Sequence, residues 1–390
     1  MQVNIFDYLP SKTFIYVDGN IREQLFNNHI GITLTNLAIN LSLKLKNISR
    51  YKTGTRAISS RIFLELVRIS NMSLEDFQNK IIIKVGKRGN KIRVGPYIQI
   101  TDDWVYVSEL IRGDGSLVKG HNTSYRTCFT NGNLTLIEFV KNFFISQGIN
   151  DKNISIYPNT KNPYIKNLEI RTEVISYFLH NFFEIPFGYK KYIYVPKFMI
   201  ENKSFSISAV RGIFDAEGSV NYRKLGNIYT RKIVIGMKDI LYLCDIQTIL
   251  TKLDISSRLY KDKGRLMYRL VIGDRDSILN FYNLIKPLHS DRNKKLYLLT
   301  NSYATKNWIT SKVLIPKILT LLLDERKRRS EICKYLNITY SMAGFRLTKM
   351  LKDDLIKIEN KINTNKGCWF VYSITDKGRN YLNDILSDFS

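Results

Sequence analysis

The amino-acid sequence predicts an α+β fold whose central part consists of two similar halves. Residues 107–115 and 210–218 repeat one pattern, in which an apolar helix ends in a small residue, an acid and a glycine. The acids of the two copies, Asp114 and Glu217, are 217 − 114 = 103 residues apart. The same order of strands and helices follows each copy, which indicates an internal duplication.

Each half is predicted to continue with two strands, a helix, two more strands and a final helix, because stretches of period two alternate with stretches of helical period. In the first half, strands are expected at residues 116–119, 125–130, 154–157 and 165–171, and helices at 134–147 and 173–183. In the second half, strands are expected at 220–223, 232–237, 258–261 and 266–272, and helices at 239–253 and 276–285. The predicted boundaries of the halves are residues 96–203 and 204–308.

The N-terminal segment, predicted to be a domain spanning residues 1–95, has a helical pattern with short breaks between residues 20 and 80. Residues 43–46 are expected to turn into a basic helix at 47–52, which ends near Gly54. This pair resembles the helix-turn-helix of Cro and repressor-type proteins, in which such a helix enters the major groove. The resemblance implies DNA contacts by Ser49, Arg50 and Lys52; a generic helical bundle is the alternative.

Two further N-terminal helices are expected at residues 62–69 and 73–80, followed by a basic linker or hairpin at 84–91. The C-terminal segment, residues 309–390, changes pattern again. Helices are expected to close at 319–323 and to span 330–336 and 341–351, followed by strands at 355–358 and 369–373 and a last helix at 375–386. This order resembles a winged helix with a wing at 363–367, and it implies DNA contacts by Arg346 and Lys349.

The charge of the chain points to a polyanionic partner. Of 390 residues, 60 are Lys or Arg and 34 are Asp or Glu, which gives a formal net charge of +26 and a pI near 9.7. Neutralising phosphates releases counterions, so this excess favours nucleic acid, although a ribosomal or simply basic protein is an alternative. The four cysteines and four histidines are scattered, which favours a reducing compartment and disfavours zinc. The sequence has no apolar run long enough to cross a bilayer, and its N-terminus lacks a signal-peptide profile. We therefore expect a soluble, cytoplasmic protein with no membrane partner.

With the two acidic segments, the chain resembles the LAGLIDADG family of homing endonucleases over about 200 residues. The duplicated form implies a single-chain, monomeric enzyme with a pseudo-twofold αββαββα core. In that family the two motif helices pack side by side, and the last acid and the preceding carbonyl of each meet at the centre of a saddle of strands. Helix C-termini carry partial negative charge and free carbonyls, so an added carboxylate favours hard divalent cations.

This resemblance implies that Asp114 and Glu217 are catalytic metal ligands, with the backbone of Gly113 and Ala216 completing the site. The expected cofactor is Mg²⁺, as two or more ions, or Mn²⁺ in its place. Asp215 is expected to cap or pair locally. A lysine that approaches the scissile phosphate is also expected from the family, and the candidates are Lys190, Lys191 and Lys294; each could equally be a solvated surface lysine.

The strands supply the expected DNA-facing residues, since long antiparallel strands in the major groove read base edges and phosphates. In residues 265–272 one face carries Arg265 and Arg269, whereas the other is apolar or aromatic. The basic residues on comparable strands are Arg126, Arg223, Lys232 and Lys261.

One residue departs from the family pattern. Close packing of the motif helices favours small residues, and Gly212 fits this rule, but its counterpart in the first copy is Glu109. A buried unpaired carboxylate is costly. Glu109 is therefore expected to tilt outward, to pair with Arg112 or Arg211, or to mark an enzyme that has lost activity.

The leading function from sequence is a site-specific, Mg²⁺-dependent endonuclease acting on double-stranded DNA. The alternatives are a non-catalytic DNA-binding transcription regulator and an RNA maturase that assists intron splicing. An intein is not expected, because the chain ends in Asp388-Phe389-Ser390 without the His-Asn ending that protein splicing needs.

Overall fold

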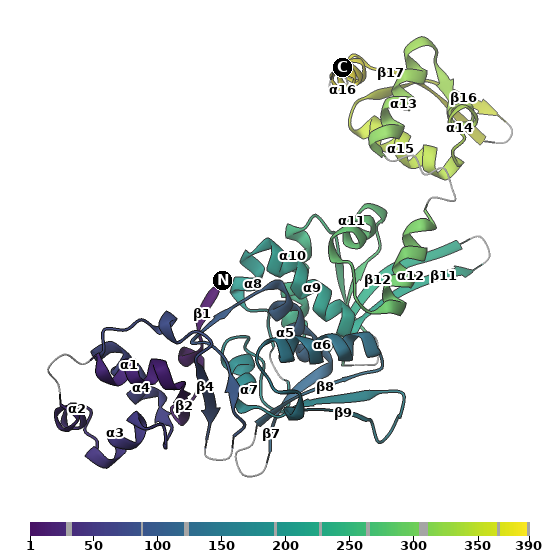
Figure 1. Ribbon diagram of the computed structural model, residues 1–390. Helices are drawn as coiled ribbons and strands as arrows, with labels where there is room; N and C mark the ends of the chain where they lie inside the picture. Colours follow the sequence, from purple (N-terminus) through teal and green to yellow (C-terminus); the bar gives the residue numbers. More distant parts are fainter. Residues whose placement is uncertain are drawn as a thin grey trace. The chain divides into compact units, whose positions relative to one another are not determined.

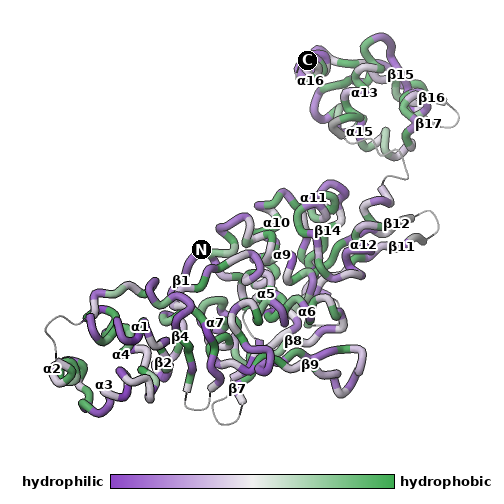
Figure 2. The backbone as a smooth tube through the Cα atoms, in the orientation of Figure 1, coloured by the Kyte–Doolittle hydropathy of each residue, from purple (hydrophilic) through white to green (hydrophobic). Residues whose placement is uncertain are grey.

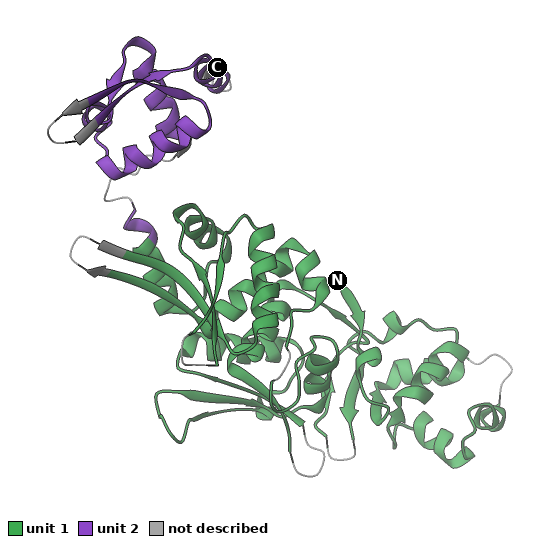
Figure 3. Ribbon diagram, turned by 180° about the vertical axis from the view of Figure 1, so that it is seen from behind, with its two compact units in different colours: residues 1–299 green, residues 300–390 purple. Residues whose placement is uncertain are grey.

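The computed structural model describes residues 1–28, 33–86, 89–120, 125–190, 193–225, 228–262, 266–303, 311–364 and 367–387. The chain divides into two compact units, Met1–Leu299 and Thr300–Ser390 (Figure 3). The domain boundaries predicted within the first unit, at residues 95 and 203, remain predictions.

The first half of the central core begins with a long helix, α5 (Asp102–Asp114), and continues as predicted. Its elements are β7 (Gly115–Lys119), β8 (Tyr125–Asn131), α6 (Leu134–Ser146), β9 (Ile154–Pro158), β10 (Lys166–Ile170) and α7 (Glu173–Asn181). The four strands form one antiparallel sheet in the order β7-β8-β10-β9.

The second half repeats this arrangement element by element (Figure 1). Its elements are α9 (Lys203–Glu217), β11 (Gly218–Leu225), β12 (Ile228–Met237), α10 (Ile240–Lys252), β13 (Arg258–Lys261), β14 (Tyr268–Ile272) and α11 (Arg275–Ile285). The sheet order, β11-β12-β14-β13, is the same as in the first half. The two halves therefore share one topology, αββαββα. Helix α8 (Lys197–Glu201) lies between the two halves, and α12 (Ser290–Asn301) follows the second.

Alternation along the strands gives each sheet a core face and an exposed face. In β14, Leu270 and Ile272 are buried, whereas Arg269 is exposed, as the sequence predicted. Arg269 lies opposite Tyr260 of β13 and Gly236 of β12. The helices α5, α6, α9 and α10 bury their apolar residues in the core beneath the sheets.

Helices α5 and α9 cross in very close contact at the centre of the first unit. A Cβ atom at Gly212 would lie 2.6 Å from the carbonyl oxygen of Tyr106 and 2.7 Å from Cβ of Glu109. At the C-terminal ends, a Cβ atom at Gly113 would lie 2.4 Å from Cβ of Ala216. Glycine at these two positions lets the backbones of the helices approach.

The N-terminal segment contains the predicted helix pair and also a sheet that the sequence analysis missed. The pair consists of α2 (Leu34–Asn40) and α3 (Leu45–Lys52), flanked by α1 (Gly19–Asn27) and α4 (Ser60–Ile69). The strands β2 (Thr13–Val17), β3 (Ile58–Ser59), β4 (Ile81–Val85) and β5 (Ile92–Arg93) form a sheet in the order β3-β2-β4-β5. A separate two-stranded sheet joins β1 (Gln2–Asn4) to β6 (Tyr97–Gln99).

Two N-terminal expectations change in detail. The helix expected at residues 73–80 is only the 3₁₀ turn η2 (Leu74–Phe77), because Gln78 leaves the helical conformation and β4 begins at Ile81. For the segment expected as a linker or hairpin at residues 84–91, β4 and β5 on either side of it pair antiparallel, which favours the hairpin; residues 87–88 lie outside the described residues. The segment packs against the first half, where Tyr8 contacts the rings of Phe178 and Phe182.

The second unit has its own apolar core. Its elements are α13 (Ser311–Asp324), β15 (Lys327–Arg328), α14 (Arg329–Leu336), α15 (Tyr340–Lys352), β16 (Ile356–Thr364), β17 (Gly367–Ile374) and α16 (Asp376–Ser387). The strands pair in the order β15-β17-β16, and buried Leu319, Leu347 and Tyr372 belong to one cluster. The helices and strands expected in this segment are present, and the winged helix itself remains a prediction; residues 365–366, at the tip of its expected wing, lie outside the described residues.

Hydrophilic and hydrophobic residues are interspersed throughout the described parts of the chain (Figure 2). Among the described residues, none of the helices has the length and apolar character needed to cross a membrane.

The glycine at the helix crossing should be far more sensitive to substitution than an open glycine. Gly212→Ala forces Cβ against α5, so we expect a loss of about 1–3 kcal/mol in the free energy of unfolding, as for other overpacked cores. Gly132→Ala is the matched control, because no atom lies within 4 Å of its added Cβ. Denaturant unfolding of both variants measures the difference; equal stabilities would contradict the close crossing.

Candidate metal site at the paired helix ends

Asp114 and Glu217 are the last residues of α5 and α9, and the strands β7 and β11 begin at the very next residues. A Cβ atom at Gly113 would lie 3.4 Å from Cγ of Glu217, so the ends of the two helices are in contact. Both helix ends present carbonyls without intrahelical donors. The structure therefore brings the two sequence-predicted acids together at the interface of the halves.

The two acids occupy a poorly solvated site. Burial and, after it, the negative charge of Glu217 raise the pKa of Asp114 to about 7, against the opposing effects of Arg292, Asn131 and Lys190. Burial also raises the pKa of Glu217, while Lys190 and Arg292 act in the opposite direction. Asn131 of β8 donates to Oδ2 of Asp114 at 2.7 Å. A site of this kind favours a bound cation or proton.

Lys190 binds the end of α5. Its Nζ donates to the carbonyl oxygens of Ile111, Arg112 and Gly113 at 3.1, 2.6 and 2.8 Å. Burial lowers the pKa of Lys190 to about 8. Of the three lysines proposed from sequence, Lys190 lies at the site, whereas Lys191 falls outside the described residues.

The third lysine candidate is not the residue that reaches the second helix end. Lys294 lies exposed on α12, and Arg292, in the first turn of that helix, points back to α9 instead. Arg292 donates to the carbonyl oxygens of Asp215 and Ala216, the latter at 2.9 Å. Sequence reasoning missed Arg292 because it searched for lysine, although a cation shortly after the last helix of the half was the right signal.

Two further carboxylates, those of Asp215 and Glu109, are buried in the same two helices, before the terminal acids. Asp215 accepts hydrogen bonds from Tyr106 Oη at 2.8 Å and from the backbone N–H groups of Leu288 and His289 at 2.7 and 3.2 Å. Glu109 is fully buried, pairs with Nε of Arg112 at 2.9 Å and accepts from the Tyr242 hydroxyl. Of the alternatives for Glu109, the structure shows the pair with Arg112; Arg211 instead lies over the ring of Tyr106.

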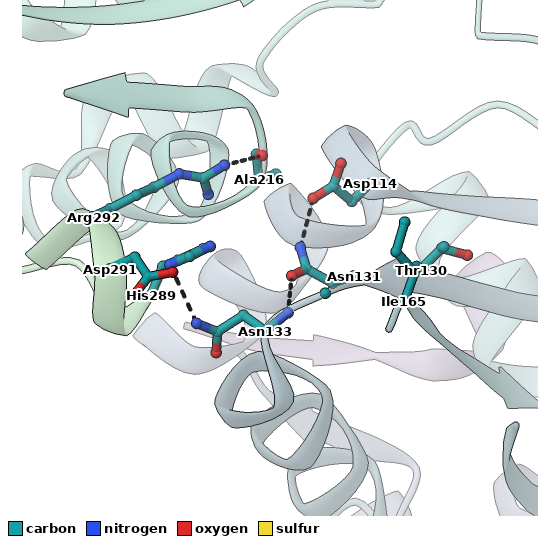
Figure 4. Close-up of a pocket in the computed structure, with 10 residues that line it drawn as sticks. Asp114, Thr130, Asn131, Asn133, Ile165, Ala216, His289, Asp291 and Arg292 are labelled. Atoms are coloured by element: carbon teal, nitrogen blue, oxygen red, sulfur yellow. Dashed lines mark hydrogen bonds between the residues drawn. The ribbon is translucent and has the colours of Figure 1, made fainter. Parts of the chain in front are cut away.

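A cavity of about 510 Å³ opens beside Asp114 (Figure 4). It is lined from the first half by Asn131 and Asn133 and from the second by His289 and Arg292. Asn133 donates to Oγ of Ser290 at 3.0 Å and lies 3.2 Å from Nδ1 of His289, so the rim also joins the halves. This cavity gives solvent and small groups access to one side of the acidic pair.

The oxygen atoms at the paired helix ends are of the kind that hard divalent cations bind. They are those of the carboxylates of Asp114 and Glu217 and the carbonyls of Gly113 and Ala216, and each carbonyl keeps a second lone pair beside the bond from Lys190 or Arg292. Among the described residues, no group of three or more His, Cys, Asp and Glu side chains gathers. A cation here would complete its shell with water and substrate oxygens, as Mg²⁺ commonly does.

The predicted DNA-facing residues of the core are exposed, with different partners. Arg223, Lys232 and Lys261 are exposed on β11, β12 and β13. Arg126 pairs with Glu169 at 3.2 Å, and Arg269 pairs with Asp262 at 2.6 Å, which lowers the charge that each can offer. Arg265 lies outside the described residues. The exposed side of the second sheet is thus the more basic part of the predicted surface.

The candidates on the flanking elements lie on helices α3 and α15. Ser49 and Arg50 are exposed on α3, whereas Lys52 is half-buried and its carbonyl accepts from Arg22. On α15, Lys349 is exposed and Arg346 is half-buried, with its guanidinium 5.5 Å from the ring centre of Phe345. Phe345 itself is 69% exposed.

Comparison with known protein families identifies one domain in this chain. Residues 204–286, which contain α9 and most of the second half, match the model of the LAGLIDADG-like domain. For the second half, the resemblance inferred from the sequence is thereby confirmed at the level of a LAGLIDADG-like domain. No curated protein matches the chain.

Solved structures with a similar arrangement include three proteins. The homing endonuclease I-DmoI, in a complex with DNA and Ca, is 19% identical, with 50% of this chain and 96% of that chain covered and a TM-score of 0.37. A variant of I-SmaMI is 12% identical, with 53% and 92% covered and a TM-score of 0.38. The N-terminal LAGLIDADG domain of DUF199/WhiA is 17% identical, with 48% and 84% covered and a TM-score of 0.33.

Asp114→Asn should stabilise the metal-free protein at alkaline pH. Since the folded-state pKa of Asp114, about 7, exceeds its ordinary value of 3.8, the folded state binds a proton more tightly. Stability therefore falls as pH rises from about 4 to 7, by an amount set by about 1.4 kcal/mol per pKa unit. The Asp114→Asn variant keeps a side-chain oxygen that accepts from Asn131. It has no carboxylate to ionise, so its stability does not fall in this way as pH rises.

With a chelator present, we expect Asp114→Asn to gain about 1–3 kcal/mol over the wild type at pH 8 and to match it near pH 4. Thermal and denaturant unfolding across this range measure the difference. Asp103→Asn, an exposed acid in the first turn of the same helix, is the control and should show no such window. A pH-independent difference for Asp114→Asn would contradict the assignment.

Proposed function

We propose that the protein is a site-specific endonuclease that hydrolyses double-stranded DNA with the help of a divalent cation. One observation carries this proposal: two equivalent helix ends, each with a carboxylate and each bound by a cationic side chain, meet between two sheets of identical topology. The LAGLIDADG-like domain at residues 204–286 supports it.

The acids would hold the cation, and the remaining groups would act on the phosphodiester. Asp114 and Glu217 would supply the carboxylates, with Gly113 and Ala216 offering carbonyl oxygens. Bound there, Mg²⁺ would polarise the scissile phosphate and make a bound water more acidic. The two acids end helices that are in contact, and the charge of Glu217 acts on Asp114, so both halves would contribute to one centre.

Lys190 and Arg292 would play unequal parts. A guanidinium keeps its charge, so Arg292 would stabilise negative charge that develops on the phosphate. Lys190, whose pKa burial lowers to about 8, could also give up or take a proton near neutral pH. We propose Lys190 as the general acid–base candidate and Arg292 as the electrostatic one.

The exposed faces of the two sheets would bind the duplex. On the second sheet, Arg223, Lys232, Arg258 and Arg269 are exposed, and Asn221 lies in register with Lys232. Such side chains contact phosphates and the edges of guanine and adenine in the major groove. Helix α3, as a helix-turn-helix, and helix α15, in a winged helix, would add contacts outside the core. A monomer with all these elements matches a long, asymmetric site.

Substituting either acid should abolish cleavage while sparing binding. We expect Asp114→Asn and Glu217→Gln each to lower the single-turnover cleavage rate by about 10²-fold or more, because each removes charge stabilisation at the reacting phosphate. The substrates are the genomic DNA that flanks the gene and duplexes selected for binding from a random library, tested with Mg²⁺ or EDTA. DNA affinity, measured in Ca²⁺, should change only a few-fold.

Asp103→Asn is again the control and should cleave like the wild type. Tight binding to a selected duplex without cleavage by the wild type in Mg²⁺ or Mn²⁺ would contradict the endonuclease and favour a DNA-binding regulator. Preferential binding of a folded intron RNA, with restored splicing, would favour a maturase.

The contribution of helix α15 can be separated from charge alone. The double variant Arg346→Ala/Lys349→Ala should weaken binding and reduce the slope of log affinity against log salt by about 1–2, since each lost phosphate contact removes about 0.9. Lys377→Ala/Arg379→Ala removes the same charge from exposed positions on α16. If the two double variants behave alike, α15 is not a DNA-contacting helix.

A further inference from the structure

The two motif helices carry opposite charges at one equivalent position. The 103-residue offset that relates Asp114 to Glu217 also relates Arg112 to Asp215, two residues before each acid. The same offset relates Glu109 to Gly212. Arg112 and Asp215 are both fully buried. A buried arginine in one half thus takes the place of a buried aspartate in the other.

Both side chains hold the start of the segment that follows the last helix of their half. We call residues 182–190, after α7, the first connector and residues 286–292, after α11, the second connector. Arg112 donates to the carbonyl oxygens of Phe183 and Glu184 in the first connector. Asp215 accepts from the N–H groups of Leu288 and His289 in the second. The contact is the same, with donor and acceptor exchanged.

The backbone of the same two residues receives the cation at the far end of each connector. Lys190, at the end of the first connector, donates to the carbonyl oxygen of Arg112 at 2.6 Å. Arg292, at the end of the second, donates to the carbonyl oxygen of Asp215. One residue of each motif helix therefore contacts its connector twice. Its side chain binds the connector backbone, and its carbonyl is one of those bound by the cation at the end of the connector.

We propose that Arg112 and Asp215 are positioning residues that place Lys190 and Arg292 on the helix ends, and that Glu109 is the counter-ion that the arginine version of this contact requires. A guanidinium buried without a partner would be strongly destabilising. Glu109 lies one turn before Arg112 and binds its Nε, and Tyr242 of α10 donates to the other carboxylate oxygen. In the second half the anchoring residue is itself a carboxylate, and the equivalent position is Gly212.

This inference deepens the proposed function, since the connectors carry the cations of the proposed site. It also explains why Glu109 stands at the helix crossing, without assuming that the enzyme has lost activity. The first half has Arg112 where the second half has Asp215, and Glu109 is the partner that this arginine needs. The first connector has a second attachment, from Gly188 N–H to the carbonyl oxygen of Leu117 at 2.8 Å. Release of Arg112 should therefore free Lys190 without unfolding the connector.

The test follows Lys190 directly and needs neither DNA nor metal. The double variant Glu109→Gln/Arg112→Met removes both buried charges together, which preserves neutrality in the core. We expect acetylation of the Lys190 amine, read by mass spectrometry, to become about tenfold faster or more, the size expected from losing hydrogen bonds to a charged group. Labelling of Lys294, exposed on α12, serves as the internal reference and should not change.

The reciprocal variant tests the second connector. Asp215→Asn keeps the shape of the side chain but loses one acceptor, so amide hydrogen exchange at Leu288 and His289 should accelerate while Lys190 stays protected. Arg112→Lys keeps a charge beside Glu109 but reaches the two carbonyls poorly, and it repeats the first test if the double variant folds badly. Selective release of one connector by its own residue supports the proposal.

Two results would overturn the positioning role. One is a Lys190 amine as protected in the Arg112 variants as in the wild type. The other is equal loosening of both connectors by either variant, which is what general destabilisation would produce. Because these measurements use the free protein, failure of DNA cleavage would leave the positioning result intact, and the converse also holds.

Discussion

The close crossing of α5 and α9 is the constraint on which the rest of the central core depends. Glycines at positions 113 and 212 allow backbone contact between two helices that belong to different halves. This contact brings two helix C-termini, with their carbonyls and acids, to one point. Two carboxylates and two sets of carbonyls would repel one another there, so the fold must deliver positive charge. Lys190 and Arg292 supply it from segments more than 70 residues away along the chain.

The two halves position these cations through different buried side chains, an arginine in the first half and an aspartate in the second. In each case a hydrogen bond from the other half satisfies the buried carboxylate. Tyr106 of α5 donates to Asp215 of α9, while Tyr242 of α10 donates to Glu109 of α5. Each half thus satisfies a buried carboxylate of the other. Buried polar groups of this kind are costly unless all are satisfied, and once satisfied they favour one arrangement over its alternatives. The register between the halves is specified by these bonds as well as by apolar packing.

The sequence predicts the core well because its signals are local and occur twice. All eight strands of the two sheets lie within a few residues of the predicted ranges, and the acids are at the predicted helix ends. The site's second layer could not be predicted in this way. The contacts of Tyr106 with Asp215 and of Glu109 with Tyr242 join residues more than 100 positions apart, and no local pattern encodes them. In the N-terminal segment, β2 and β4 were missed because single short strands among helices give a weak periodic signal.

Each acid is joined to its sheet without any intervening loop. Helix α5 ends at Asp114 and β7 starts at Gly115; α9 ends at Glu217 and β11 starts at Gly218. A loop would absorb a distortion of the strand, whereas a direct junction transmits it. A twist that a bound partner imposes on β7 or β11 would therefore act directly on the helix end that carries the carboxylate. The fit of a partner on the two sheets would thus be coupled to the positions of the two acids. A partner that fits poorly would leave the acids at a different separation from one that fits well.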